Sequence, residues 1–556
     1  MFALLQLSRS MQMESPSAMR TYALLASPAQ VHALFLLFPR NKKHIKNRLP
    51  DRFFNFRAVL IFSTQCRCAF LSDIMDGMKT KKNDYILPEM NRERNRSLRN
   101  TAAGCSRFVM DDSAVNIGRG KKYYIRTYGC QANVRDGETM AGILELMGFE
   151  MTESTSEADV LIFNTCAIRQ AAEDRVFGEI GSLKSVKAKH PGQIICLCGC
   201  MAQEEVVVNR IISSYPQVDL VFGTHNLWRL PELLVKVMAT GKRTIEVLSQ
   251  EGDLIEELPV RRSASAKGFV HIMYGCDKFC TYCIVPYTRG RERSRRKEDI
   301  LAEIRALKQE GRKEAVLLGQ NVNAYGKDLG MEDGFTSLLE SAAETGIERI
   351  RFYTSHPRDY SATTIDAMVK YPNIMKSLHL PVQSGSDEIL KRMNRGYTAD
   401  SYRKLYDDMR KKIPDITFTT DLIVGFPGET DEQFQATLDL VDYCQFDLAY
   451  SFVYSPRSGT PAARMEDNIP AEVKKERLQI LNDRLSAIAA ARNRTYLGRT
   501  LKVLCEGPSK KNEEVLSGYS EENKLVNFRG DPSMTDQIVD VEITAVHSFS
   551  LDGKAL

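Results

Sequence analysis

The chain has 556 residues, of which 43% are hydrophobic and 26% charged, and its formal net charge is +5. This balance is ordinary for a globular protein, and at roughly 100–200 residues per domain it predicts about three or four domains. The 13 cysteines are an odd number spread thinly over the chain, which argues against a secreted disulfide scaffold and favours metal or redox use in a reducing cytoplasm. The most apolar early stretch, residues 22–38, is interrupted by Pro28, Gln30 and His32, so we expect neither a membrane span nor a signal peptide.

Residues 1–118 show no clear periodicity and mix apolar with basic pieces, so we expect this part to be poorly ordered. We further hypothesise that residues 1–74 are an upstream read-through, because Met75 and Met78 each offer a plausible second start. Peptides from residues 1–70 in a mass spectrum of the native protein would contradict this hypothesis.

From residue 119 to residue 245, short apolar runs alternate with segments of helical periodicity. Alternating strands and helices predict an α/β domain with a parallel sheet that is covered on both faces. After it, residues 246–266 are expected to form a polar connector. The expected strands are 123–125, 160–163 and 194–197, and the expected helices are 138–147 and 175–186.

Residues 267–496 contain a second and longer series of strands and helices. Six strands at this spacing predict an incomplete parallel (β/α)6 barrel. In residues 497–556, short strands separated by turn residues predict a small antiparallel β-barrel. The expected strands of the large barrel are 268–274, 314–319, 349–353, 376–380, 416–424 and 447–453. The expected helices are 298–310, 334–345, 361–370, 386–394, 400–412, 431–443 and 470–496. The expected strands of the small barrel are 501–506, 515–519, 524–528 and 538–546.

Cys276, Cys280 and Cys283 form the strongest chemical signal, a C-x-x-x-C-x-x-C run in the loop after the strand 268–274. Thiolates are the usual ligands of iron–sulfur clusters, and three of them hold three irons of a four-iron cluster. The fourth iron then stays open to an amino-acid-like ligand that binds through its amine and carboxylate. The loop lies at the carboxyl end of a barrel strand, where barrel enzymes place their sites. The alternative is a structural zinc site, but zinc sites favour paired C-x-x-C motifs and the sequence has no second pair nearby.

A second set of cysteines, Cys130, Cys166 and Cys200, is dispersed, and each comes soon after a predicted strand of the first domain. The carboxyl ends of parallel strands converge on one edge of a sheet, so three thiols there could hold a second cluster, again with one open iron. Spacing alone is weak evidence, because a cysteine is often a small buried hydrophobic residue. From the residues alone both interpretations stay open, and we interpret Cys196 and Cys198 as core.

Four motifs carry a family resemblance. The segments TYGCQAN at 127–133, NTC at 164–166 and GCMAQ at 199–203, with the run 275–293, resemble the motifs of the methylthiotransferases, a family of radical S-adenosylmethionine enzymes. They occur in one unbroken order within residues 120–556. The Tyr-Gly-Cys-Gln-x-Asn form resembles the MiaB branch, which modifies tRNA, more than the RimO branch, which modifies a ribosomal protein. The resemblance implies a second cluster on the dispersed cysteines and a TRAM-like RNA-binding barrel at the C-terminus.

The function that this resemblance implies is transfer of a methylthio group to carbon 2 of N(6)-isopentenyladenosine, next to the anticodon of tRNA. The implied cofactors are two 4Fe-4S clusters and S-adenosyl-L-methionine. The implied partners are a tRNA that carries isopentenyladenosine and an electron donor such as flavodoxin or ferredoxin. We expect a cytoplasmic monomer without membrane association, and we expect the two clusters to face each other across the mouth of the barrel.

Polar residues after two further barrel strands are candidate cofactor contacts. Gln320 and Asn321 follow the strand 314–319, and Gln383 and Ser384 follow the fourth strand of the series. Their amide and hydroxyl groups could hydrogen-bond S-adenosylmethionine, although such residues are as often part of turn chemistry.

Basic side chains mark two candidate RNA contacts. Residues 289–297 carry six basic side chains in nine positions directly after the cysteine cluster, and a loop of the small barrel carries two lysines. An isolated basic run is more often a solvated face, but its position here favours substrate contact, and lysines in such a loop fit salt-sensitive contact with phosphates. The candidate residues are Arg289, Arg291, Arg293, Lys510 and Lys511.

Two alternatives stay open. A RimO-type enzyme would carry out the same chemistry on a ribosomal protein side chain, and the opening motif argues against it. An RNA-binding protein with purely structural clusters would more naturally use four ligands per cluster than three. Turnover of S-adenosylmethionine to 5′-deoxyadenosine would separate an enzyme from this second alternative.

Overall fold

The computed structural model describes residues 85–89, 103–167, 170–263, 265–510 and 512–556. Residues 1–84 and 90–102 lie outside the described residues. The read-through hypothesis for residues 1–74 and the expectation of poor order for these two ranges therefore stay predictions. Within the described part of the chain, no helix combines the length and the apolar character that crossing a membrane requires.

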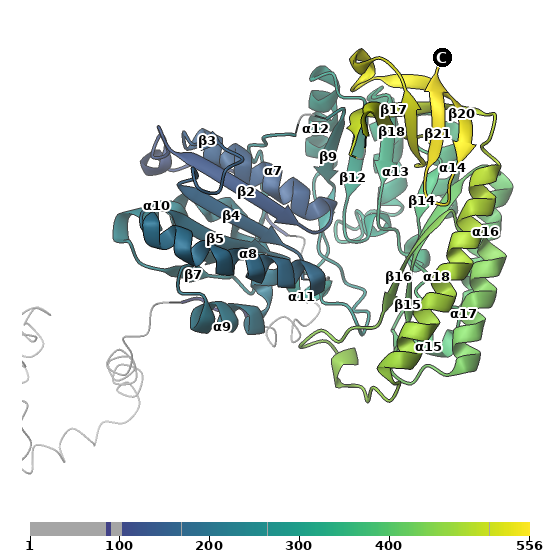
Figure 1. Ribbon diagram of the computed structural model, residues 1–556, viewed down its shortest axis with the longest axis horizontal. Helices are drawn as coiled ribbons and strands as arrows, with labels where there is room; N and C mark the ends of the chain where they lie inside the picture. The colour runs from purple at the N-terminus through teal and green to yellow at the C-terminus, as the bar shows by residue number, and fades with distance from the viewer. Residues whose placement is uncertain (1–84, 90–102, 168–169, 264, 511) are drawn as a thin grey trace, which may run out of the picture. The chain divides into compact units, whose positions relative to one another are not determined.

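A six-stranded, fully parallel sheet forms the centre of the first domain (Figure 1). Its strands are, in spatial order, β3 (Glu150–Met151), β2 (Lys122–Tyr128), β4 (Val160–Thr165), β5 (Ile194–Gly199), β6 (Leu220–Phe222) and β7 (Thr244–Glu246). Every residue of β4 and β5 is buried, as expected for central strands of a sheet that is covered on both faces. The prediction of a parallel α/β domain is confirmed, although β6 and β7 were not foreseen.

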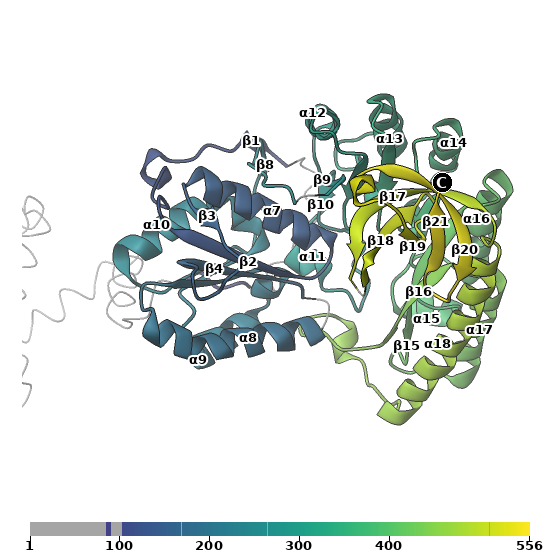
Figure 2. The same cartoon turned by 45° about the horizontal axis from the view of Figure 1, so that its top comes forward.

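Helices cover both faces of this sheet (Figure 2). The helices are α7 (Gln131–Leu146), α8 (Gln170–Lys189), α9 (Glu205–Ser214) and α10 (Leu230–Thr240). Helices α7 and α10 share one apolar cluster with the sheet, while α8 and α9 share the other. The prediction that α7 starts at Glu138 is wrong, because the helix begins directly after Cys130. Its first turns carry polar side chains such as Asn133 and Asp136, which are buried and hide the apolar periodicity.

The segment before the sheet is folded as well. Strand β1 (Cys105–Arg107) pairs in parallel with β8 (Leu254–Glu256), which lies in the predicted connector. Phe108 and Met110 then pack against the core of the first domain. The expectation of poor order is therefore wrong for residues 103–118. The partner strand is far away in sequence, so no local pattern reveals this pairing.

Six parallel strands form the open barrel of the second domain (Figure 1). The strands are β9 (Lys267–His271), β12 (Glu314–Leu318), β13 (Arg349–Phe352), β14 (Ser377–His379), β15 (Thr417–Val424) and β16 (Leu448–Val453). The helices are α12 (Lys297–Gln309), α13 (Gly334–Glu344), α14 (Ala362–Lys370), α15 (Asp387–Arg392), α16 (Ala399–Lys412), α17 (Asp431–Cys444) and α18 (Ala471–Arg494). The strands form two hydrogen-bonded groups, β9-β12-β13 and β14-β15-β16, and a bridge between Ile350 and Ile374 links the two groups. Outward-facing strand residues and the helices share one large apolar cluster. The predicted barrel is confirmed, with strand and helix ends that differ by a few residues.

The C-terminal part is a closed five-stranded barrel, whose strands follow the order β17-β18-β19-β21-β20 around the ring. The strands are β17 (Thr500–Ser509), β18 (Asn512–Ser520), β19 (Leu525–Arg529), β20 (Ile538–Val546) and β21 (Leu551–Ala555). The expectation of a purely antiparallel barrel is wrong, because β19 and β21 pair in parallel. A closed ring with an odd number of strands cannot alternate direction throughout, so one parallel pair is required. Strand β21 was not foreseen.

A buried arginine joins the two barrels. Arg349 on β13 is 1% exposed, and its guanidinium donates to Tyr519 O at 3.0 Å and to Lys502 O at 2.7 Å. Both acceptors are backbone carbonyls of the small barrel. Both hydrogen bonds come from a charged and buried donor, so this side chain fixes the small barrel on the large one.

We predict that Arg349→Met weakens the attachment of the small barrel by about 2–4 kcal/mol, because two backbone carbonyls lose hydrogen bonds from a charged donor. Native-state hydrogen exchange measures this as a lower opening free energy for the amides of β17 and β18. The matched control is Arg403→Met on α16, whose partly exposed side chain pairs with the exposed Asp400. That substitution should change the opening free energy by less than about 1 kcal/mol. Equal effects of the two substitutions would contradict the role of Arg349.

Candidate metal centres

Cys130, Cys166 and Cys200 all lie at one edge of the first sheet. The last paired residues of β2, β4 and β5 lie opposite one another in the register of the sheet. Cys166 and Cys200 directly follow β4 and β5, and Cys130 follows one residue beyond the end of β2. The parallel register therefore brings together three cysteines that are dispersed in sequence, as the sequence predicts.

Two glycines allow the chain to turn at this edge. Gly199 has φ of +90°, and a Cβ atom there would lie 2.5 Å from Asn164 Oδ1 and 2.5 Å from Thr165 O. Gly129 has φ of +145°, and a Cβ atom there would lie 2.8 Å from the Cβ atom of Cys166. Neither the backbone conformation nor the space admits a side chain. The glycines of the GC pairs are thus needed to bring the cysteine that follows each of them to the edge.

A pair of buried asparagines fixes the start of α7 to the end of β4. Asn133 Nδ2 donates to Asn164 Oδ1 and to Thr165 O, both at 3.2 Å, and Asn164 Nδ2 donates to Asn133 O at 2.7 Å. Asn133 Oδ1 also accepts from Cys130 Sγ at 3.4 Å. Both amides are 0% exposed, so these hydrogen bonds lock the backbone that presents the first two cysteines.

The Cys276–Cys283 loop is held at its start by the barrel. Gly275 has φ of +75°, and its N–H donates to Gln320 Oε1 at 2.7 Å. A Cβ atom there would lie 1.9 Å from Arg291 O, so the position requires glycine. The Arg291 side chain forms a bidentate pair with Asp277 at 2.8 and 2.9 Å. This pair ties the start of the loop to the segment just before the short strand β11 (Arg293–Ser294).

The far end of the loop is held by the chain segment that follows α15. Thr281 N donates to Met393 O at 3.0 Å, and Asn394 Nδ2 donates to Phe279 O at 3.1 Å. The buried Arg395 donates from Nη1 to Cys280 Sγ at 3.3 Å and from Nη2 to Pro381 O at 2.8 Å. A fixed cation thus lies against one of the three thiols, where it offsets the negative charge of a thiolate ligand.

Each site offers three thiols, and the donor set fits an iron–sulfur cluster. Among the described residues, neither trio brings its three sulfurs within 4.8 Å of one another, as the ligands of a single ion would lie. Burial raises the pKa of Cys200 to about 12 and that of Cys283 to about 12. A raised pKa favours the protonated thiol. Iron binding therefore has to displace these protons, since a metal binds the thiolate form.

The two cysteine loops meet at the short helix α11 (Val285–Thr288), which begins two residues after Cys283. Ile284 and Tyr287 pack in one small apolar cluster with Cys200 of the first domain. The helix that follows one trio thus lies on a cysteine of the other trio. That the two clusters face each other stays a prediction, and this contact supports it.

Comparison with known proteins agrees with this arrangement. Residues 122–223 match the uncharacterized protein family UPF0004, residues 270–441 the radical SAM superfamily, and residues 494–556 the TRAM domain. Two curated relatives are tRNA-2-methylthio-N(6)-dimethylallyladenosine synthases. The protein of Bacillus licheniformis is 54% identical over 448 residues, which cover 80% of this chain and 88% of the relative. The protein of Bacillus subtilis is 53% identical over 448 residues, with the same shares of the two chains.

The chain belongs to the family of tRNA-2-methylthio-N(6)-dimethylallyladenosine synthases. The family resemblance found in the motifs is thereby confirmed. As a radical SAM enzyme of this family, the chain uses 4Fe-4S clusters and S-adenosylmethionine. The structure agrees with the family through its three parts, each of which coincides with one of the matched regions.

The predicted cofactor contacts differ in how they are engaged. Gln320 holds the cysteine loop through Gly275, which makes it a support for the loop. Asn321 donates from Nδ2 to Asp359 at 2.6 Å, while its Oδ1 is buried without a hydrogen-bond partner among the described residues. Ser384 is 0% exposed and bonds within its own turn and to Thr437. Gln383, at φ of +73°, is also buried. A cofactor role for these four residues stays a prediction.

The predicted RNA contacts differ in their exposure. Arg289 is 5% exposed and Arg293 is 9% exposed, so the basic run is not a solvated face at these positions, and this burial argues against RNA contact by either side chain. Arg293 donates to the backbone of the connector at Glu251 O, at 3.2 Å. Arg291 is occupied by its pair with Asp277. Lys510 is exposed and stays a candidate, and Lys511 lies outside the described residues.

Three supporting residues were missed from the sequence, namely Asn133, Arg395 and Asp136, and Arg289 was expected in a different role. Each supports a cysteine or its neighbour from a distant part of the chain. A polar residue that is buried for this purpose has no local pattern. The one available signal was the break in apolar periodicity over the first turns of α7.

We predict that Gly199→Ala abolishes the first-domain cluster, because the new Cβ clashes with the buried amide oxygen of Asn164 and with the backbone oxygen of Thr165 and displaces Cys200. The reconstituted protein should then hold about four irons per chain, where the parent holds about eight. The matched control is Gly178→Ala in the exposed part of α8, where a Cβ meets no atom within 4 Å. It should keep the iron content of the parent. Full iron content in Gly199→Ala would contradict the geometry described for this edge.

Proposed function

We propose that this chain transfers a methylthio group to carbon 2 of N(6)-isopentenyladenosine next to the anticodon of tRNA. The observation that carries the proposal is the junction of the two cysteine trios at α11. One trio comes from each domain, and the helix after Cys283 lies on Cys200. A sulfur source and a radical source must act on one carbon atom, and this junction offers a place where both can reach it.

The inside of the large barrel is suited to a purine with an apolar tail. In the register of β15 and β16, Asp421 lies opposite Tyr450 and Ile423 lies opposite Phe452. The alternate residues of β15 pack outward on the helices, so these four side chains face the inside. Tyr450 is 48% exposed and Phe452 is 41% exposed. Exposed aromatic faces at the open edge of the barrel favour stacking on a splayed-out base.

The residues of the chain bind, orient and exclude water, while the cofactors supply the reactive groups. When bound, the clusters and S-adenosylmethionine supply three reactive groups: a sulfur atom, a methyl group, and a 5′-deoxyadenosyl radical that removes hydrogen from carbon 2. The Cys276–Cys283 loop is braced at both ends, by Gln320 and by the segment after α15. This bracing would hold a cluster on these three cysteines in a fixed position relative to the barrel interior.

The small barrel supports tRNA as the substrate. It matches the TRAM domain, and Lys502 and Lys510 are exposed on its surface. Lysines placed in this way contact the phosphate backbone without reading sequence. We further propose a low-potential electron donor such as flavodoxin or ferredoxin as partner, and the cytoplasm as the place of action, because the substrate is tRNA.

Nucleoside mass spectrometry tests the proposal. Cells that lack the gene should lose 2-methylthio-isopentenyladenosine from their tRNA and accumulate isopentenyladenosine. The intact chain should restore the modified nucleoside, whereas Cys200→Ala should not. The matched control is Cys198→Ala, because the buried sulfur of Cys198 packs on Met140 Sδ at 3.6 Å in the core of the first domain. An unchanged nucleoside profile in the deletion would remove the assignment and favour methylthiolation of a ribosomal protein side chain.

A second measurement separates the roles of the two trios. Purified Cys200→Ala should still cleave S-adenosylmethionine to 5′-deoxyadenosine, because the Cys276–Cys283 loop is intact. Cys280→Ala should lower this cleavage by at least about 100-fold, since it removes a ligand of the radical cluster. Cleavage that is lost in Cys200→Ala and kept in Cys280→Ala would reverse the two assignments.

A further inference from the structure

Arg289 belongs to the radical domain but contacts a cysteine of the first domain. It follows α11 directly, six residues after Cys283. Its Nε donates to Cys200 Sγ at 3.1 Å. The side chain is 5% exposed, so this cation is placed in the interior at the junction of the two domains. A buried charge of this kind persists when it is paired and hydrogen-bonded.

The guanidinium is fixed on its other side by Asp136, which lies on α7. Arg289 Nη2 and Asp136 Oδ2 form an ion pair at 2.6 Å. Although burial raises it, the pKa of Asp136 is held at about 2, chiefly by Arg289, so the carboxylate stays charged. The planar fork of an arginine reaches the sulfur and the carboxylate at the same time, and a lysine has no such geometry.

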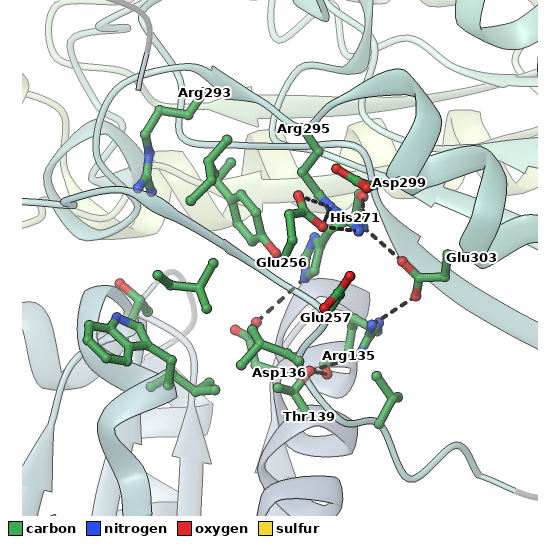
Figure 3. A pocket seen from close by; sticks show the side chains of 18 of the residues that line it. Arg135, Asp136, Thr139, Glu256, Glu257, His271, Arg293, Arg295, Asp299 and Glu303 are labelled. Carbon is green, nitrogen blue, oxygen red and sulfur yellow. Dashed lines mark hydrogen bonds and ion pairs between the residues drawn. The ribbon is translucent and has the colours of Figure 1, made fainter. Parts of the chain in front are cut away.

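Asp136 is in turn braced from the barrel, in a cavity of about 380 Å³ between α7, the connector and the start of the barrel. His271 Nε2 at the end of β9 lies 3.5 Å from Asp136 Oδ1 (Figure 3). The neighbouring Arg135 pairs with Glu303 of α12 at 2.9 Å, as Figure 3 also shows. The position of Arg289 is thus set by contacts with both domains.

The same short segment also supports the radical cluster. Cys276 N donates to Gly290 O at 3.1 Å, one residue after Arg289. One stretch of backbone therefore holds a ligand of the radical trio, while the adjacent side chain holds a ligand of the other trio. Hydrogen bonds to ligand sulfurs and nearby charge set the reduction potential of an iron–sulfur cluster.

We propose that Arg289 is a positioning residue for the first-domain cluster, with Asp136 as its anchor: it holds the Cys200 thiolate and stabilises the more negative, reduced state of that cluster. This inference rests on the proposed assignment of Cys130, Cys166 and Cys200 to a cluster. It goes beyond that assignment by giving the radical domain control over the potential of the neighbouring cluster. RNA contact was the expectation for Arg289, and this inference gives the side chain a different role.

The test isolates one cluster. In the full-length chain, Cys276→Ala, Cys280→Ala and Cys283→Ala remove the radical cluster, so that the reconstituted protein carries only the first-domain cluster. A redox titration followed by electron paramagnetic resonance then gives its reduction potential, without tRNA and without activity. In this background, Arg289→Gln should lower the potential, because the reduced state loses a cation and a hydrogen bond. Asp136→Asn keeps Arg289 and removes the anion that partly neutralises it, so it should raise the potential.

The matched control is Arg262→Gln. Arg262 is a partly buried arginine that lines the same cavity and pairs with Glu303 at 2.9 Å. It should leave the potential unchanged, which separates a local effect on the sulfur from a general loss of buried charge. If Arg289→Gln does not take up iron, Arg289→Lys replaces it in the redox titration. It keeps the charge without the fork, so its potential should lie between those of Arg289→Gln and the parent.

The inference would be overturned if the reduction potential did not differ among the parent, Arg289→Gln, Arg289→Lys and Asp136→Asn. Arg289 would then be an ion-pair partner that only closes the domain junction. An equal drop in Arg262→Gln would overturn it as well. A parent that forms no cluster would overturn both this inference and the assignment of the first-domain cysteines. The loss of tRNA modification in the deletion strain is measured independently, so failure of the proposed substrate is recognised separately.

Discussion

The parallel register of β2, β4 and β5 is the constraint on which the first-domain site depends. Because the paired ends of these strands are aligned, the residues that follow them arrive at one edge, and three cysteines become neighbours. Glycine at position 199 and at position 129 lets the backbone turn there, and the Asn133–Asn164 pair keeps the turns in place. The Cys276–Cys283 loop likewise follows a parallel strand, β9, and Gln320 holds the start of the loop through Gly275.

Buried charge at the domain junction is organised around these sulfurs. Arg395 lies against Cys280 and Arg289 lies against Cys200, and each guanidinium is held by other acceptors as well. An isolated buried cation would be costly, and so would a buried thiolate without a cation or metal. The two requirements compensate each other, which explains why arginines that look like a solvated basic run in the sequence are interior residues in the structure. The contacts of Arg289 also tie the two domains together.

The large barrel could be predicted almost completely from the sequence, because each strand and helix carries its own apolar periodicity. The cysteine trios could be predicted from spacing and motif. The pairing of β1 with β8 could not, since the partner is distant in sequence and both strands are short. The start of α7 was missed because its first turns bury polar groups such as Asn133 and Asp136. The periodicity of a segment reflects how its residues pack within their own helix or strand. These residues instead contact a helix, strand or loop that is distant in sequence.

The central claim is that two clusters lie at one rigid junction, close enough to act on the same carbon atom. Electron paramagnetic resonance of the reduced protein with both clusters tests it most directly. The account predicts magnetic interaction between the clusters, seen as splitting or faster relaxation that is absent from the spectra of the two single-cluster variants. A spectrum equal to the simple sum of those two spectra would contradict the account.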